Sequence, residues 1–145
     1  MHKLMAILDS NNSDKAKVDA AIVLGEYRAT EAVPVLLRHL ELDEVSRGGF
    51  FNGRIREEEL EEKSAPVTIA LEKIGMPAIP ALLNKITQTD DAKIAEKCVS
   101  ICQTIEGQEV TQFRLQGLLQ KETDQKKKGR IQSALEALKN LKAEK

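Results

Sequence analysis

The sequence predicts an all-α protein, a right-handed α-solenoid of about three helix pairs with capping helices. One observation behind this prediction is composition: 41% of the 145 residues are hydrophobic and 31% are charged, but only 3% are aromatic. A balance of this kind, rich in Ala, Leu, Ile, Glu and Lys, favours helices over strands. The other observation is a repeated phrase, in which an apolar helix ends at a glycine and the next helix starts near a proline. Helix pairs with this pattern bury their apolar faces by stacking on one another.

The first copy of the phrase opens with a helix N-terminal signal. Ser13 or Asp14 is a suitable N-cap, because their side-chain oxygens accept hydrogen bonds from the free backbone N–H groups of the first turn. The apolar residues that follow predict a helix to about Leu24. Gly25 is then expected to supply the turn.

The second helix of each copy starts near a proline. In the first copy Thr30 is placed to cap this helix, and Pro34 lies in its first turn, where a missing N–H costs little. In the second copy Gly75 ends one helix and Pro77 is expected at the first position of the next. Both second helices carry an apolar stripe at helical spacing, made of Val33, Leu36, Leu37 and Leu40 in one copy and of Ile79, Leu82, Leu83 and Ile86 in the other.

Three further helices are predicted after these copies. The first has Ile94, Cys98, Ile101, Cys102 and Ile105 on one face, the second carries Val110, Phe113, Leu115, Leu118 and Leu119, and the last, a cap, carries Ile131, Ala134, Leu135 and Leu138. We interpret Cys98 and Cys102 as small buried apolar residues. A zinc site needs about four ligands, and the two histidines, His2 and His39, lie in other segments. We predict no metal or cofactor site.

Two phrases of the sequence resemble the HEAT repeat family, and within it the short HEAT-like repeats of phycobilisome-lyase type. These phrases are Leu24-Gly25 with Ala32-Val33-Pro34-Val35-Leu36-Leu37, and Ile74-Gly75 with Ala78-Ile79-Pro80-Ala81-Leu82-Leu83. The resemblance is detailed over residues 16–40 and 66–86. It implies that residues 1–145 form a single HEAT-like repeat domain, but it does not imply one function, because such repeats serve as scaffolds in many kinds of protein.

An inserted loop at about residues 43–62 interrupts the repeat, where a link of a few residues would be enough. One interpretation is a recognition loop, with phenylalanines as apolar anchors and arginines as forked donors to carboxylate or phosphate. Its candidate partner-binding residues are Arg47, Phe50, Phe51, Arg54 and Arg56. The other interpretation is that a phenylalanine packs between the repeats and that Glu57–Glu62 begin the next helix, where acidic residues favour the helix dipole.

Several classes of function are not favoured by the sequence. The formal net charge is −1 and aromatic residues are few, which argues against nucleic acid as the partner. The apolar start of the chain is too short for a secretion signal, and no run approaches the roughly 20 apolar residues that span a bilayer. With only two cysteines, a reducing cytoplasm is the expected location. His39 has no nucleophile or acid placed beside it by a motif, and we find no catalytic constellation.

We therefore expect a non-enzymatic protein–protein interaction or scaffold module whose partner is another protein. Two alternatives stay open. In the first alternative, the protein is a subunit of a phycobilin-lyase-like or other modifying enzyme and holds a small molecule in its concave face. In the second alternative, it is a weak nucleic-acid binder. The second alternative would use the basic run Lys126–Lys128.

Overall fold

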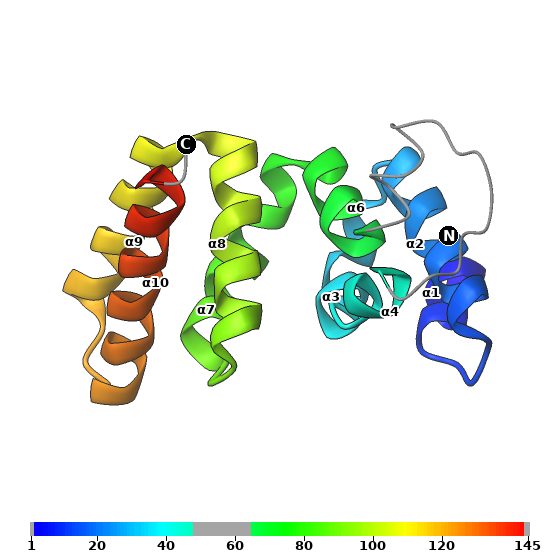
Figure 1. Cartoon of the computed structure of the whole chain (residues 1–145), viewed down its shortest axis with the longest axis horizontal. Helices are drawn as coiled ribbons and strands as arrows, with labels where there is room; N and C mark the ends of the chain where they lie inside the picture. The colour runs from blue at the N-terminus through cyan, green and yellow to red at the C-terminus, as the bar shows by residue number, and fades with distance from the viewer. Residues whose placement is uncertain (1, 48–64, 144–145) are drawn as a thin grey trace. The chain divides into compact units, whose positions relative to one another are not determined.

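The computed structural model describes residues 2–47 and 65–143 of the chain. Every secondary-structure element in these ranges is helical, so the all-α prediction is confirmed for them (Figure 1). The chain divides into two compact units, Met1–Ala78 and Ile79–Lys145, which we call unit 1 and unit 2.

The described part of unit 1 contains five α-helices and two short 3₁₀ helices. They are α1 (His2–Leu8), α2 (Asp14–Glu26), η1 (Thr30–Ala32), α3 (Val33–Arg38), α4 (Leu42–Arg47), α6 (Pro66–Ile74) and η2 (Met76–Ala78). The capping role of Ser13 is confirmed, because its Oγ accepts a hydrogen bond from the Ala16 N–H at 3.2 Å. The capping role of Thr30 is wrong. Thr30 begins η1, and the residue before α3 is Ala32, which makes no side-chain cap.

Gly25 does not form the turn that the sequence predicts. It lies inside α2, which continues to Glu26. A Cβ at this position would lie 2.7 Å from the Cα of Ala70 in α6, closer than two carbon atoms approach without a clash. The glycine is needed because it allows the two helices to approach closely, and not because it bends the chain.

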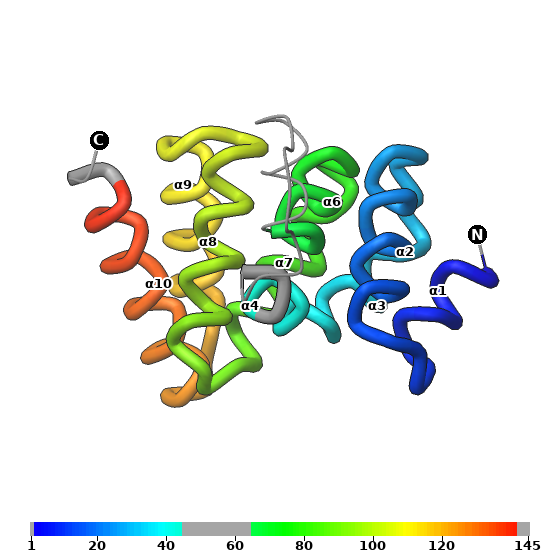
Figure 2. The backbone as a smooth tube through the Cα atoms, turned by 45° about the vertical axis from the view of Figure 1, so that its right-hand side comes forward, coloured from blue at the N-terminus to red at the C-terminus, as the bar shows by residue number. Residues whose placement is uncertain are grey.

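Helices α2 and α6 pack side by side and run in the same direction (Figure 2). Gly25 near the end of α2 contacts Ala70, and one residue later the Glu26 carboxylate pairs with the Lys73 ammonium. Earlier in α2, Ile22 borders a small gap that Pro66, at the start of α6, also lines. Because the contacts advance together along both helices, the two C-terminal ends lie on the same side of unit 1.

The carboxylate of Asp43 caps α6 from a distant position in the sequence. Asp43 lies in α4 and is fully buried. Its Oδ1 accepts a hydrogen bond from the Val67 N–H at 2.9 Å, and its Oδ2 accepts one from the Thr68 hydroxyl at 2.6 Å. The residue directly before α6, Ala65, supplies no side-chain cap. Asp43 therefore fixes the start of α6 against α4.

Unit 2 consists of four helices in its described part. They are α7 (Ile79–Gln88), α8 (Ala92–Glu106), α9 (Gln108–Lys121) and α10 (Gln125–Ala143). Helix α10 packs on each of the other three. The prediction for Pro77 is wrong: it lies in η2 of unit 1, and α7 begins at Ile79 with Pro80 as its second residue. Gly75 and Gly107 follow α6 and α8 with φ of 79° and 88°, values that glycine adopts most readily.

The apolar stripes form the cores of the two units. In unit 1 the fully or nearly fully buried residues of the first stripe are Val33, Leu36, Leu37 and Leu40, as predicted. In unit 2 Ile79, Leu82 and Ile86 are buried, whereas Leu83 is half-buried. On α9, only Leu115 of the predicted apolar residues is fully buried, and Val110 and Phe113 face solvent.

Replacing Gly25 by alanine is expected to destabilise the protein by about 1–3 kcal/mol, because the new methyl group overpacks the contact with Ala70. The matched control is Gly129→Ala in α10, where a Cβ would meet nothing within 4 Å. Helix propensity favours alanine by up to about 1 kcal/mol at that site, so the control is expected to gain stability. Urea unfolding of both variants measures the difference. Equal stability gains would mean that α2 and α6 do not approach as described.

Asp43→Ala is expected to lower the free energy of unfolding by about 2–4 kcal/mol. The substitution leaves the buried Val67 N–H without an acceptor and also removes a charge-assisted bond from Thr68. The control is Asp19→Ala, which removes an exposed carboxylate from α2. Urea unfolding monitored by circular dichroism provides the measurement. A loss for Asp43→Ala no larger than that of the control would contradict the cap.

Candidate protein-interaction surface

The two cysteine thiols do not form a reactive site. Cys98 and Cys102 are buried in α8, which confirms their interpretation as core residues. Burial raises the pKa of each thiol to about 12, which strongly suppresses the thiolate. Among the residues that the structure describes, no group of three or more His, Cys, Asp or Glu side chains is arranged to hold a metal ion.

A cluster of charged side chains surrounds His39 in unit 1. Its Nε2 lies 2.8 Å from an Asp9 carboxylate oxygen, and its Nδ1 lies 3.2 Å from a Glu41 carboxylate oxygen. Arg38 donates to the other Asp9 oxygen at 2.7 Å. The hydrogen bond from His39, and then that from Arg38, holds the pKa of Asp9 below its usual value.

This cluster has the geometry of a set of ion pairs between two helix ends, and not that of a catalytic nucleophile with its general base. Both ring nitrogens of His39 face carboxylates. The nearest hydroxyl in the sequence to Asp9 is Ser10, and its Oγ donates to the Ile7 carbonyl at 2.7 Å, away from the imidazole. We conclude that the cluster holds the end of α1 against the end of α3.

A hollow of about 360 Å³ opens in unit 2 between the α7–α8 turn and the start of α10. Lys126 and Arg130 line it together with Asp90 and Asp91. Arg130 donates to the Asp90 carboxylate at 2.7 and 2.9 Å and to the Thr87 carbonyl at 2.9 Å. Since this guanidinium is bound within the unit and two carboxylates share the hollow, the arrangement does not suit a phosphate or nucleic-acid backbone.

The structure locates only one of the five partner-binding residues that the sequence predicts in the insertion. Phe50, Phe51, Arg54 and Arg56 lie outside the described residues, and Arg47 is the last residue of α4. The predicted insertion begins at about residue 43, but the structure continues as helix to Arg47. The recognition role of the remaining segment stays a prediction from the sequence.

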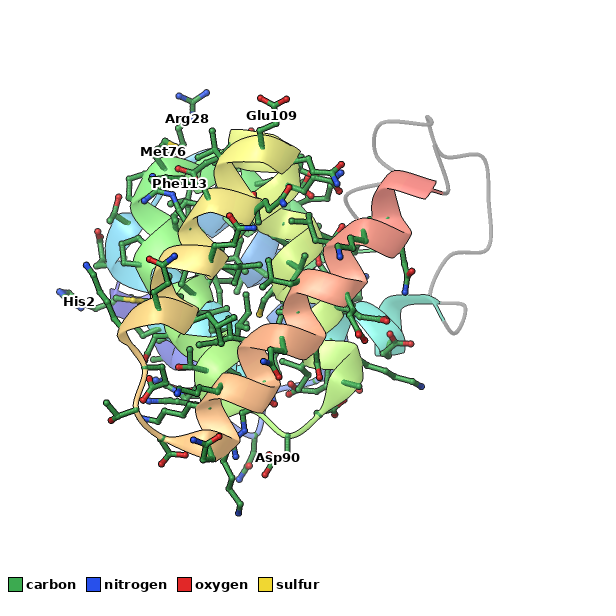
Figure 3. The ribbon with its side chains drawn as sticks, turned by 90° about the vertical axis from the view of Figure 1, so that its left-hand side faces the viewer. His2, Arg28, Met76, Asp90, Glu109 and Phe113 are labelled. Carbon is green, nitrogen blue, oxygen red and sulfur yellow. The ribbon has the colours of Figure 1, made fainter. Side chains whose placement is uncertain are left out.

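An exposed surface that the sequence did not reveal lies at the ends of α2 and α6. We call Tyr27, Arg28, Met76 and Pro77 the turn surface. Tyr27 is 69% exposed and Met76 is 54% exposed, and both other residues are also exposed. Because α2 and α6 run in the same direction and their ends are joined by the Glu26–Lys73 ion pair, the two turns start side by side. Figure 3 shows Arg28 and Met76 at the same end of unit 1.

Arg28 has an unusual backbone conformation for a non-glycine residue. Its φ is +50°, the only positive value at a non-glycine residue in the described part of the chain. Its N–H donates to the Gly25 carbonyl at 3.0 Å, and the next N–H, that of Ala29, donates to the Leu24 carbonyl at 3.0 Å, so this turn ends α2. Glycine is the usual residue here, since a side chain with positive φ costs about 1–2 kcal/mol.

The Arg28 side chain is free to bind a partner. It is exposed, and within the described residues its guanidinium has no hydrogen-bond or ion-pair partner. No sequence signal marks this position, because the sequence predicts Gly25 as the turn residue. A strained, exposed arginine next to Tyr27 in the sequence is therefore a finding of the structure.

Comparison of the chain with models of known protein families, with curated proteins and with solved structures finds no match. Among the described helices, none alone is long and apolar enough to cross a membrane; α6 and α7 meet the criteria of length and composition only when joined. Both are largely core helices of their units. The candidate surface therefore has to be interpreted from its own chemistry.

The burial of the two thiols gives a testable prediction about their reactivity. A pKa of about 12, compared with the model-peptide value of 9.0, lowers the thiolate population at pH 8 roughly a thousandfold. We expect iodoacetamide to alkylate Cys98 and Cys102 slowly in the native protein and rapidly in urea, as measured by intact-mass spectrometry. Native labelling as fast as that of the unfolded chain would place the thiols at the surface.

Proposed function

We propose that this protein is a non-enzymatic protein–protein interaction module built from HEAT-like helix pairs, arranged as a right-handed α-solenoid. The repeated phrases support this assignment. So does the packing of α6 on α2, because the first helices of the two phrases lie side by side in the same direction. Stacking of equivalent helices is the way in which helical repeats bury their apolar faces.

The turn surface is the partner-binding site in this proposal, and the observation that carries it is the strained Arg28. Tyrosine, arginine and methionine are the residue types enriched in protein interfaces. Tyr27 and Met76 offer large apolar contacts, and Arg28 offers a forked donor. A turn that needs only glycine carries an arginine, which is expected where the side chain is used.

This chemistry specifies the partner's binding segment. It is a protein segment with a carboxylate flanked by an apolar side chain. The carboxylate accepts two hydrogen bonds from Arg28, and the apolar side chain packs against Tyr27 or Met76. Interfaces of this kind concentrate their affinity in a few such residues.

Arg28→Gly tests the proposal because it separates stability from binding. Glycine relieves the positive φ but is more flexible in the unfolded chain, so stability is expected to stay unchanged or rise by at most about 1 kcal/mol. Binding is expected to fall at least about tenfold, as is usual for a residue at the centre of an interface. Urea unfolding measures the first effect, and quantitative capture of partner proteins from an extract of the source cells measures the second.

Two further variants make this test specific. The double variant Tyr27→Ser, Met76→Ser is expected to lose the same captured proteins as Arg28→Gly. Gln132→Ser is the control, because it shortens an exposed side chain of α10 in unit 2, outside the turn surface. Capture that is unchanged by Arg28→Gly and by the double variant would refute the turn surface as the binding site.

A loop replacement distinguishes the turn surface from the predicted recognition loop. Replacing residues 48–56 with a short Gly-Ser linker keeps the whole of α4, including Asp43, and therefore the cap on α6. The protein is expected to stay folded, since loop closure changes by only about 0.6 kcal/mol per doubling of length. If this variant loses the captured proteins and Arg28→Gly keeps them, the site is the insertion.

A further inference from the structure

The solvent-facing side of α9 carries two large exposed apolar side chains and a self-complementary row of residues. Phe113, labelled in Figure 3, is 76% exposed, and Val110 is 43% exposed, although both are large apolar side chains. One turn after Phe113 comes Gly117, where a Cβ would meet nothing within 4 Å. At the two ends of the row stand Glu109 and Lys121, both exposed.

We propose that α9 is a homodimerisation helix, which pairs antiparallel with α9 of a second copy of this chain. The inference goes beyond the proposed function, because α9 belongs to unit 2 and the turn surface belongs to unit 1. The proposal is based on one row of residues at a spacing of four, Glu109, Phe113, Gly117 and Lys121.

The residues of this row are complementary to the same row on a second copy that runs in the opposite direction. In an antiparallel pair related by a two-fold axis at the level of Leu115, Phe113 of each copy meets Gly117 of the other. The exposed aromatic ring then fills the space that the glycine leaves open. Rows of residues four apart are the ridges that interdigitate in the commonest class of helix packing, in which the helices cross at about −50°.

The charges of the row favour a second copy over an unrelated partner. The same two-fold axis places Glu109 of one copy opposite Lys121 of the other, so each pairing brings together opposite charges. Neither residue has a salt-bridge partner within the described part of the chain. The exposed residues between them, Val110, Phe113, Gln116 and Gln120, are uncharged and do not repel a second copy.

The size of the surface sets the expected affinity. A single helix pair is smaller than the roughly 1,200–2,000 Å² that a stable interface buries. We therefore expect a weak dimer with a dissociation constant on the order of 1–100 µM. Its ion pairs lie at the rim, so the dimer is expected to weaken as salt rises.

Sedimentation velocity of the full chain over a range of protein concentrations, up to about 1 mM, tests the proposal. The unmodified protein is expected to shift from monomer to dimer. Phe113→Ala is expected to raise the dissociation constant at least about tenfold. Gly117→Leu is expected to abolish the dimer, because the new side chain occupies the space needed by Phe113. Circular dichroism of each variant confirms that the helices are retained.

Two controls make the result specific to this face. Gly129→Leu introduces the same side chain into α10 at a position with equal open space, and it is expected to leave the dimer intact. Glu109→Lys alone and Lys121→Glu alone are each expected to weaken the dimer, and the double variant is expected to restore it. A protein that stays monomeric up to about 1 mM, or a dimer that Gly117→Leu leaves unchanged, overturns the proposal.

Discussion

The close approach of α2 and α6 at Gly25 and Ala70 is the constraint on which the rest of unit 1 depends. The backbone of one helix occupies the space that a side chain would need on the other, so the two helices have one register in which they fit. That register brings Glu26 to Lys73 and sets the two helix ends side by side. The turn surface is thus a consequence of a packing contact that lies outside it.

A buried carboxylate provides the second constraint. Asp43 sits in the interior, where a lone charge is costly, but two donors and the positive end of the α6 dipole compensate it. These bonds join α4 directly to the start of α6, which are the two helices on either side of residues 48–64 in the sequence. A long insertion at this place is therefore compatible with a stable unit 1, whatever its function.

The sequence predicted the helical class and most of the core, because spacing along one helix determines which of its faces is apolar. Leu36 and Leu82 are buried for that reason. Three features were missed because they depend on contacts between distant residues. In the sequence, a glycine that forms a turn cannot be distinguished from a glycine that leaves room for Ala70 until the packing partner of the helix is known. Likewise, nothing near Asp43 in the sequence identifies it as the cap of a helix that starts 23 residues later. Arg28 was missed as a consequence of the error at Gly25.

In the part of the chain that the structure describes, three residues that follow helices have positive φ. Gly75 and Gly107 follow α6 and α8, where the chain uses the residue with least strain, but Arg28 follows α2. The same backbone conformation is thus adopted by two glycines and by one arginine, and only the arginine adds an exposed side chain that can bind a partner. If α9 dimerises as proposed, each assembly carries two such turn surfaces. Two weak sites in one assembly bind a partner with repeated segments far more tightly than one site does. Dimerisation and partner binding then reinforce each other through the number of turn surfaces in one assembly.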